Sequence, residues 1–491
     1  MSSTITPSYT PARGLTPTGT KVTGLFGFTA RLTKARFASR QGESLLYLAA
    51  IFAFTISAGL ALTVAGGTWM FFNRWQHPFG SVAGLVAENP EFDVLLQSYF
   101  VLAILACALL IPAIYSLASG AAVLGARGRE RRLAALRLLG LSSTDVTRMS
   151  LIDTLLQATI GVVIGTVGYL ATLPLWSNLE MIGMPLSATE LLLPWPLLIV
   201  IDLVVIGLGI VSAWWGLRQV RISPLGVARR TSRPGLRAWR VVLFGIVLCA
   251  GAVFLGTFSL SVGVSGFLML GGVILIMVQG FNIAGPWFLQ QLSKLIALSP
   301  FPSVIWAARR IQANPKTTWQ RVIGISLLSL IGGFVALMPI STAGGAEDPG
   351  ANTFVSTVQW DYTKGVIITL AVGFALTAVS IFIAQASAVF ERAEQTVAMY
   401  KMGAPLSFNT KVMWLETLGP LVFAVLLGSG LGTLMAYPVF RLASNVGVVS
   451  GEGPIVMAIV LVAGLGLAMI ALAACQPLQR RVLAVQARAN D

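Results

Sequence analysis

Ten long apolar stretches constrain the fold of this chain more than any other feature of its sequence. A helix needs about 20 apolar residues to cross the hydrocarbon core of a bilayer. The stretches are residues 45–71, 96–124, 151–176, 191–216, 240–260, 263–286, 322–342, 364–390, 412–438 and 454–476. Of all residues 56% are hydrophobic and only 10% are charged, which is too few charges for a water-soluble protein. The sequence therefore predicts an all-α, polytopic membrane protein with about ten transmembrane helices.

Lys and Arg residues lie almost entirely on one side of the predicted membrane. An even number of helices puts both termini on that same side, and only Arg74, Lys364 and Arg441 fall on the other. Because basic segments stay in the cytoplasm, we expect a multi-pass protein of the cell (plasma) membrane with both termini cytoplasmic. The net charge of +15 follows from this orientation, so we expect no nucleic-acid partner.

No catalytic, nucleotide-binding or metal-binding motif emerges from the sequence. The nearest approach to a phosphate-binding loop is GLTPTGTK at 14–21, which ends in Gly-Thr-Lys instead of Gly-Lys-Ser/Thr. The single histidine, His77, has no cysteine beside it, and the three cysteines lie inside apolar stretches. We expect the chain to be no enzyme and to hold no cofactor or metal of its own.

An internal repeat divides the chain. Residues 137–155 and 400–418 align at a constant offset, which pairs Gly140 with Gly403 and Asp153 with Glu416. Each repeated unit begins with a basic amphipathic segment, residues 31–40 in the first unit and residues 307–321 in the second. We expect four regions: a disordered cytoplasmic N-terminus (1–25), a first four-helix repeat (26–235), a two-helix linker (236–300) and a second four-helix repeat (301–488).

The cytoplasmic segments carry a family resemblance. RERRLAALRLLG at 129–140 and ERAEQTVAMYKMG at 391–403 follow the second predicted span of each repeat, and Pro-Leu sequences, RISPLGVARR at 221–230 and CQPLQRRVLAV at 475–485, follow the fourth. This arrangement resembles the FtsX/MacB-like permeases of ABC transport systems. The chain is similar to a ten-span, duplicated, BceB-like member without the large extracellular domain.

The resemblance implies a coupling role for these two segments. Each would form a coupling helix that engages one subunit of a cytoplasmic ABC ATPase, with two ATPase copies per chain and with ATP and Mg bound by that partner. The residues implied are Arg131, Arg132, Leu136, Arg137, Gly140, Glu394, Tyr400, Lys401 and Gly403. The alternative is that the basic residues anchor to anionic membrane lipid and set the topology.

Three acidic residues lie inside predicted spans, where charge is costly enough to suggest a function. Asp153 and Glu416 lie near the cytoplasmic ends of equivalent spans, so we expect them to bond basic coupling segments or helix ends. Asp202 lies near the middle of span four. It either lines a cavity or carries a proton, or it is a hydrogen-bonded acid in the packing.

Four glycines have the small-xxx-small spacing that lets membrane helices approach closely. They are Gly161, Gly165, Gly428 and Gly432, on spans three and nine. We expect them to serve helix packing. These equivalent, close-packed spans suggest that the two repeats face each other as a pseudo-dimer within one chain; the alternative is a homodimer.

These features predict a permease subunit that couples ATP hydrolysis by a separate ATPase to export or membrane extraction of a lipid-like, amphipathic, drug or peptide substrate. The alternative is an ATP-driven mechanotransmission or signalling module that activates an extracytoplasmic protein, such as a cell-wall hydrolase. An ion-coupled carrier is disfavoured because the repeats are parallel and not inverted.

Overall fold

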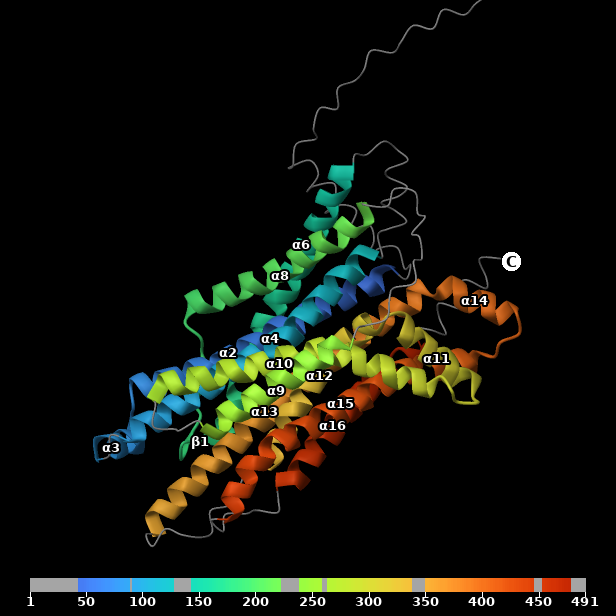
Figure 1. Cartoon of the computed structure of the whole chain (residues 1–491). Helices are drawn as coiled ribbons and strands as arrows, with labels where there is room; N and C mark the ends of the chain where they lie inside the picture. Colours follow the sequence, from blue (N-terminus) through green and yellow to red (C-terminus); the bar gives the residue numbers. More distant parts are fainter. Residues whose placement is uncertain are drawn as a thin grey trace, which may run out of the picture.

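The fold is a bundle of long helices, as a computed structural model of the chain shows (Figure 1). The structure describes residues 43–88, 91–127, 143–221, 238–257, 263–337, 349–445 and 453–477. The long helices are α2 (Glu43–Gln76), α4 (Glu91–Arg127), α6 (Ser143–Thr172), α8 (Trp195–Arg221), α9 (Trp239–Thr257), α10 (Gly263–Ile296), α12 (Pro315–Ala336), α13 (Pro349–Glu391), α15 (Leu406–Asn445) and α16 (Gly453–Ala473). The predicted all-α membrane fold is confirmed.

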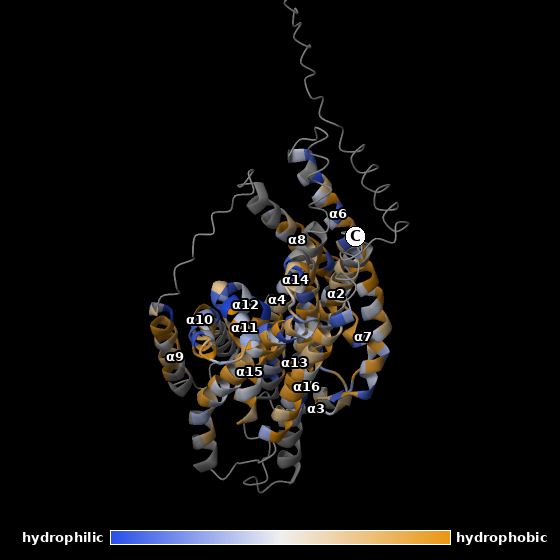
Figure 2. Ribbon diagram, turned by 90° about the vertical axis from the view of Figure 1, so that its right-hand side faces the viewer, coloured by the Kyte–Doolittle hydropathy of each residue, from blue (hydrophilic) through white to orange (hydrophobic). Residues whose placement is uncertain are grey.

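Eight helices of the described part are long and apolar enough to cross a membrane. They are α2, α4, α6, α8, α12, α13, α15 and α16. The helices α9 and α10 occupy the remaining two apolar stretches, and α10 has Pro286 in its interior. The total of ten spans remains a prediction. Figure 2 shows hydrophobic residues along most of the length of these helices.

The spanning helices pack as two groups of four. In the first half, α2 packs against α4 and α6, and α8 packs against α4 and α6. In the second half, α12 packs against α13, α15 and α16, and α16 also packs against α13. The contact between the halves runs along α4 and α13, where the hydroxyl oxygens of Ser116 and Ser380 lie 3.2 Å apart. The hydroxyl groups of Ser98 and Tyr362 form a second hydrogen bond between the same two helices, at 2.6 Å. Both pairs are 264 residues apart, nearly the spacing of the sequence repeat.

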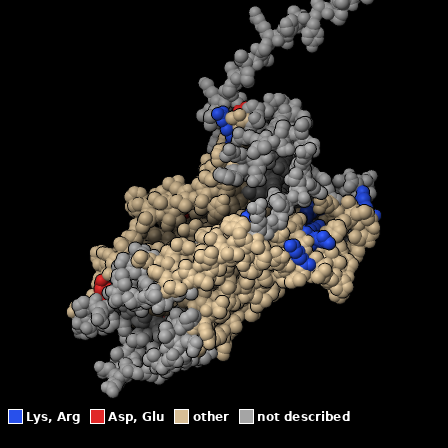
Figure 3. All heavy atoms as spheres, in the orientation of Figure 1, with Lys and Arg blue, Asp and Glu red and all other residues tan. Residues whose placement is uncertain are grey.

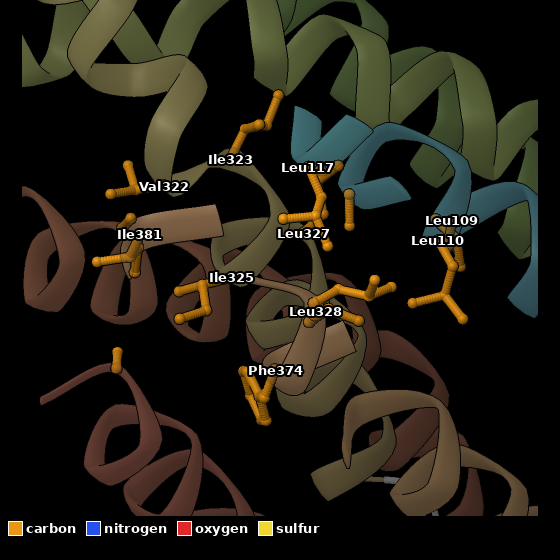
Figure 4. Packing of buried hydrophobic residues seen from close by; sticks show 14 of the residues in the cluster. Leu109, Leu110, Leu117, Val322, Ile323, Ile325, Leu327, Leu328, Phe374 and Ile381 are labelled. Carbon is orange, nitrogen blue, oxygen red and sulfur yellow. The ribbon is translucent and has the colours of Figure 1, made fainter. Parts of the chain in front are cut away.

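The main hydrophobic core lies where the two halves meet. Figure 4 shows leucines of α4 and α12 directed toward one another, with Phe374 and Ile381 of α13 beside them. Among the eight candidate spans α12 is the most deeply buried, whereas α8 and α16 are the least. The central helix therefore contacts protein on most sides, while α8 and α16 leave apolar faces for lipid.

The four glycines pack within each half and not between the halves. A Cβ on Gly165 of α6 would lie 2.6 Å from the carbonyl oxygen of Thr55 in α2, and Gly161 meets the same helix one turn away. In the second half, Gly428 and Gly432 of α15 meet the backbone of α12 in the same manner. The glycines therefore allow the close α2–α6 and α12–α15 contacts, whereas α4 and α13 join the two halves.

We expect Gly432→Ala to destabilise the protein strongly and Gly430→Ala, two residues away, to leave it unchanged or slightly more stable. A Cβ at position 432 would overlap the carbonyl oxygen of Leu330 and lie 2.7 Å from the amide nitrogen of Phe334, and backbone atoms cannot rotate away. Such overpacking costs about 1–3 kcal/mol. Gly430 has nothing within 4 Å of its Cβ position. Thermal unfolding in mild detergent measures both variants; equal midpoints would show that α15 can shift away from α12.

The segment predicted as one basic amphipathic stretch at 307–321 is two helices. Helix α11 (Pro302–Ala313) ends before Asn314, and α12 begins at Pro315. Proline suits the first position of a helix, because the backbone N–H that it lacks would have no partner within the helix there. Trp319 is fully buried, and its ring fills the space beside Gly285 of α10. This contact holds α10 against α12 of the second half.

The two ends of the bundle differ in structure and in charge. One end carries α3 (Gly80–Glu88) and a hairpin of two short strands, β1 (Glu180–Met181) and β2 (Met184–Pro185). The opposite end carries α11 and α14 (Ala393–Lys401) (Figure 1). We call them the hairpin end and the α14 end. On the face shown in Figure 3, Lys and Arg gather beside α11 and α14.

Candidate functional site

The short helix α14 stands between two spanning helices at the α14 end. The backbone amide of Ala404 donates to the carbonyl of Met399 (3.0 Å), across Gly403, whose φ is +88°. This 6→1 bond with a left-handed residue inside it is the usual C-terminal cap of a helix, and glycine adopts that conformation at no steric cost. Gly403 therefore ends α14 and turns the chain into α15.

The tip of this segment is exposed. Lys401, Met402 and Gly403 all face outward, and the Met402 side chain is 78% exposed. Glu394 and Tyr400 lie near the two ends of α14. An unbranched apolar side chain that protrudes beside a lysine is suited to insertion into a groove of another protein.

A buried carboxylate connects α14 to the bundle. Glu416 of α15 accepts two hydrogen bonds from Arg392, at 2.7 Å and 2.8 Å, and one from Arg310 at 3.3 Å. Arg392 is the residue between the end of α13 and the start of α14, and Arg310 belongs to α11. A bidentate pair of this kind fixes the relative orientation of its partners. We call Glu416, Arg392 and Arg310 the Glu416 junction.

The α11 side of the junction is braced by aromatic rings. The guanidinium of Arg310 lies 5.9 Å from the ring centre of Trp306, and that ring meets Phe408 of α15 edge to face. Burial, and next the neighbouring charge of Arg392, lower the pKa of Arg310 below its ordinary value; arginine stays charged all the same. Two cations therefore share one carboxylate, so the junction depends on Glu416.

The sequence-predicted residues of the first copy are only partly described. Arg131, Arg132, Leu136, Arg137 and Gly140 lie outside the described residues. Asp153, the counterpart of Glu416, is buried in α6.

Asp202 lies half-buried on α8 against α6. Its Oδ2 is 2.9 Å from the hydroxyl of Thr166, which also lies 3.0 Å from the carbonyl of Val162. One hydroxyl proton serves only one acceptor at a time. The other oxygen, Oδ1, is buried without a hydrogen-bond partner among the described residues. Asp202 therefore bonds within the first half, whereas the Glu416 junction belongs to the second half.

Sequence reasoning missed Arg310 and Arg392 as partners of Glu416. The usable signal was the need of an acid inside a span for a nearby cation, since Arg392 lies in the motif 391–403. Sequence reasoning also missed the hydrogen bonds that Arg74 and Lys364 make at the hairpin end. Both residues are among the three basic residues predicted to lie on the non-cytoplasmic side.

One family matches part of the chain. Residues 121–225 match the family described as FtsX-like permease C-terminal, a range that includes α6, the hairpin and α8. No curated protein and no solved structure matches the chain. Together with the eight apolar helices, this match shows a membrane protein that is similar to FtsX-like permeases over residues 121–225.

Proposed function

We propose that the chain is the transmembrane permease subunit of an ABC transporter, working with a separate cytoplasmic ABC ATPase. The observation that carries the proposal is the FtsX-like match at 121–225, because permeases of this family normally partner with such an ATPase. In this proposal the α14 end faces the cytoplasm. Both termini then lie there too, and ATP and Mg bind to the partner.

The Glu416 junction supplies a path for force. Closure of an ATPase dimer would displace α14 through its exposed tip at Met402. Because Arg392 is held by two hydrogen bonds to Glu416, a displacement of α14 would pull on α15 and α13 together. The segment 129–140 would contact the second ATPase copy, which gives two ATPase subunits per chain.

The substrate in this proposal is lipid-like or amphipathic, and includes drugs and peptides, exported or extracted from the membrane. Large apolar side chains on α8 and α16 are exposed, among them Leu203, Ile459 and Ile470. A substrate that reaches the protein through the bilayer meets such faces first. These faces also bind membrane lipid.

Purification from native membranes in mild detergent tests the proposal. We expect two copies of an ATP-binding subunit per chain in the measured mass of the complex. A folded chain without any ATP-binding subunit would reject the ABC assignment. An outer-domain protein in the complex would favour the mechanotransmission alternative.

A pair of matched variants tests α14 as the docking element. Met402→Glu places a charge at the exposed tip, and we expect it to lower ATPase stimulation at least tenfold. Leu298→Glu is the control, because Leu298 is 82% exposed in the turn between α10 and α11 at the same end. ATPase activity is measured with purified partner and permease variants. Equal loss in both variants would show that contact with the partner is not centred on α14.

A further inference from the structure

The hairpin between α6 and α8 has a turn that its own sequence disfavours. Ile182 and Gly183 form the two-residue turn, with φ of +59° and +68°. Positive φ at both positions is the mark of a type I′ turn, which favours Asn-Gly. A β-branched residue at positive φ is a strained exception. Strain of this kind persists only where surrounding contacts impose it, and it often marks a functional element.

The contacts that impose the strain come from both halves of the protein. The Ile182 side chain is 6% exposed and packs with Leu96 and Tyr99 of α4. Tyr362 of α13, in the second half, packs against the same cluster, and its ring centre lies 5.0 Å from that of Tyr99. The tip of the hairpin thus fills the seam between α4 and α13.

Asp361 of α13 bonds the hairpin tip to the second half. Its Oδ2 accepts from the backbone amide of Ile182 at 2.6 Å and from the hydroxyl of Tyr99 at 3.1 Å. Its Oδ1 accepts from Lys364 at 2.8 Å, and the same ammonium group donates to the carbonyl of Glu180 at 2.6 Å. Asp361 is 2% exposed, so water has little access to its carboxylate.

Apart from the bond from Lys364 to Glu180, the remainder of the hairpin is bonded to the first half. Arg74 of α2 is buried and donates to the carbonyls of Met181 (2.7 Å) and Pro185 (3.2 Å). Its third bond goes to Glu190, in α7 (Ala188–Leu191), at 2.6 Å. The base of the hairpin is therefore bonded mainly to the first half, while its tip is also bonded to the second.

We infer that the Ile182 tip and Asp361 form a latch that holds the hairpin end of the two halves closed. A charged carboxylate with three donors makes a strong contact, and it is confined to one small site, so it can break and reform as a unit. The latch would open when the halves part during a transport cycle. That last step rests on the proposed function; closure of the hairpin end by these residues does not.

Cysteine labelling tests the latch. Leu96 is 3% exposed beneath the hairpin tip, so we would place Leu96→Cys in a full-length chain whose Cys107, Cys249 and Cys475 are replaced by alanine. The protein is held in nanodiscs, which leave both ends accessible, and a sulfonated maleimide is the probe. We expect Asp361→Ala to raise the labelling rate of the cysteine introduced at position 96 at least tenfold. Asp93→Asn is the control, because Asp93 accepts from Trp75 and Gln97, both in the first half.

A second variant separates loss of the latch from loss of the fold. Ile182→Asn creates the Asn-Gly turn that favours this hairpin, and it removes the apolar side chain from the seam. We expect labelling at position 96 to rise as it does in Asp361→Ala, with an unfolding midpoint no lower than that of the parent chain. Unchanged labelling in both variants would overturn the latch.

The nucleotide arm of the experiment tests the proposed function separately. With the partner ATPase and a non-hydrolysable ATP analogue, we expect the labelling rate at position 96 in the chain with an intact latch to change at least threefold. If the latch variants label faster but the nucleotide has no effect, closure by these residues stands and ATP-driven opening is rejected.

Discussion

Glu416→Ala is expected to lower ATPase stimulation by the permease at least tenfold while leaving the protein folded. The change leaves Arg392 and Arg310 beside each other without their shared carboxylate. Removing one partner of a buried ion pair costs about 3–5 kcal/mol. Here we expect about 1–3 kcal/mol, because the Arg392 and Arg310 side chains are 31% and 26% exposed and water can solvate them. We expect a larger loss of ATPase stimulation than this loss of stability would cause by itself, because α14 loses its bidentate attachment to α15.

The measurement is ATPase activity of the reconstituted complex, with thermal unfolding of each variant alongside. We expect at least a tenfold loss for Glu416→Ala and partial recovery for Glu416→Asp, which keeps the charge but shortens the reach. Arg310→Ala should have a smaller effect because its bond is longer. Arg309→Ala is the control, since Arg309 is the exposed neighbour on the same helix. Full stimulation in Glu416→Ala would exclude the junction from force transmission.

A disulfide between α4 and α13 is expected to arrest the transport cycle. In the double variant Ser116→Cys, Ser380→Cys, the two sulfur atoms would replace hydroxyl oxygens that lie 3.2 Å apart, which is close enough for a disulfide after small side-chain adjustments. The bond would join the two halves along the α4–α13 contact. If the halves must part for substrate to pass, oxidation should lower ATP-driven activity more than tenfold, and a reductant should restore it.

The chain provides a matched control for this cross-link. The Thr68 hydroxyl lies 3.1 Å from the sulfur of Cys107, so Thr68→Cys creates a disulfide between α2 and α4, inside the first half. We expect that bond to leave activity within about twofold of wild type, because both helices move together. The native Cys249 and Cys475 are replaced by alanine in both proteins. Equal activity of the oxidised and reduced Ser116–Ser380 double variant would show that α4 and α13 do not separate.

Much of the helical architecture could be predicted because a membrane span is a local property. The length of an apolar stretch and its interruption by polar residues decide where a helix lies, and each of the ten stretches is helical over most of its described residues. The α11–α12 boundary shows the limit of this reasoning: hydropathy and charge run continuously through 307–321, while Pro315 starts a new helix.

The candidate site could be predicted in part for a similar reason. A carboxylate in a span requires a cation, so Glu416 could be assigned to bond a basic coupling segment. Its cations come from α11 and from the α13–α14 joint, more than 100 and about 24 residues away. Spacing along the chain does not report which of several arginines lies closest in space.

The sequence by itself determined the membrane class, the helical segments, the repeat and the positions that carry charge in the membrane, because all of these follow from composition over short windows. Only the tertiary structure decided the partners. Gly165 and Gly432 could have served any helix contact, and only the packing assigns them to α2 and α12. Ile182 is the clearest case: its local preference opposes the turn it occupies, and contacts with α4 and Asp361, made between distant parts of the chain, outweigh that preference.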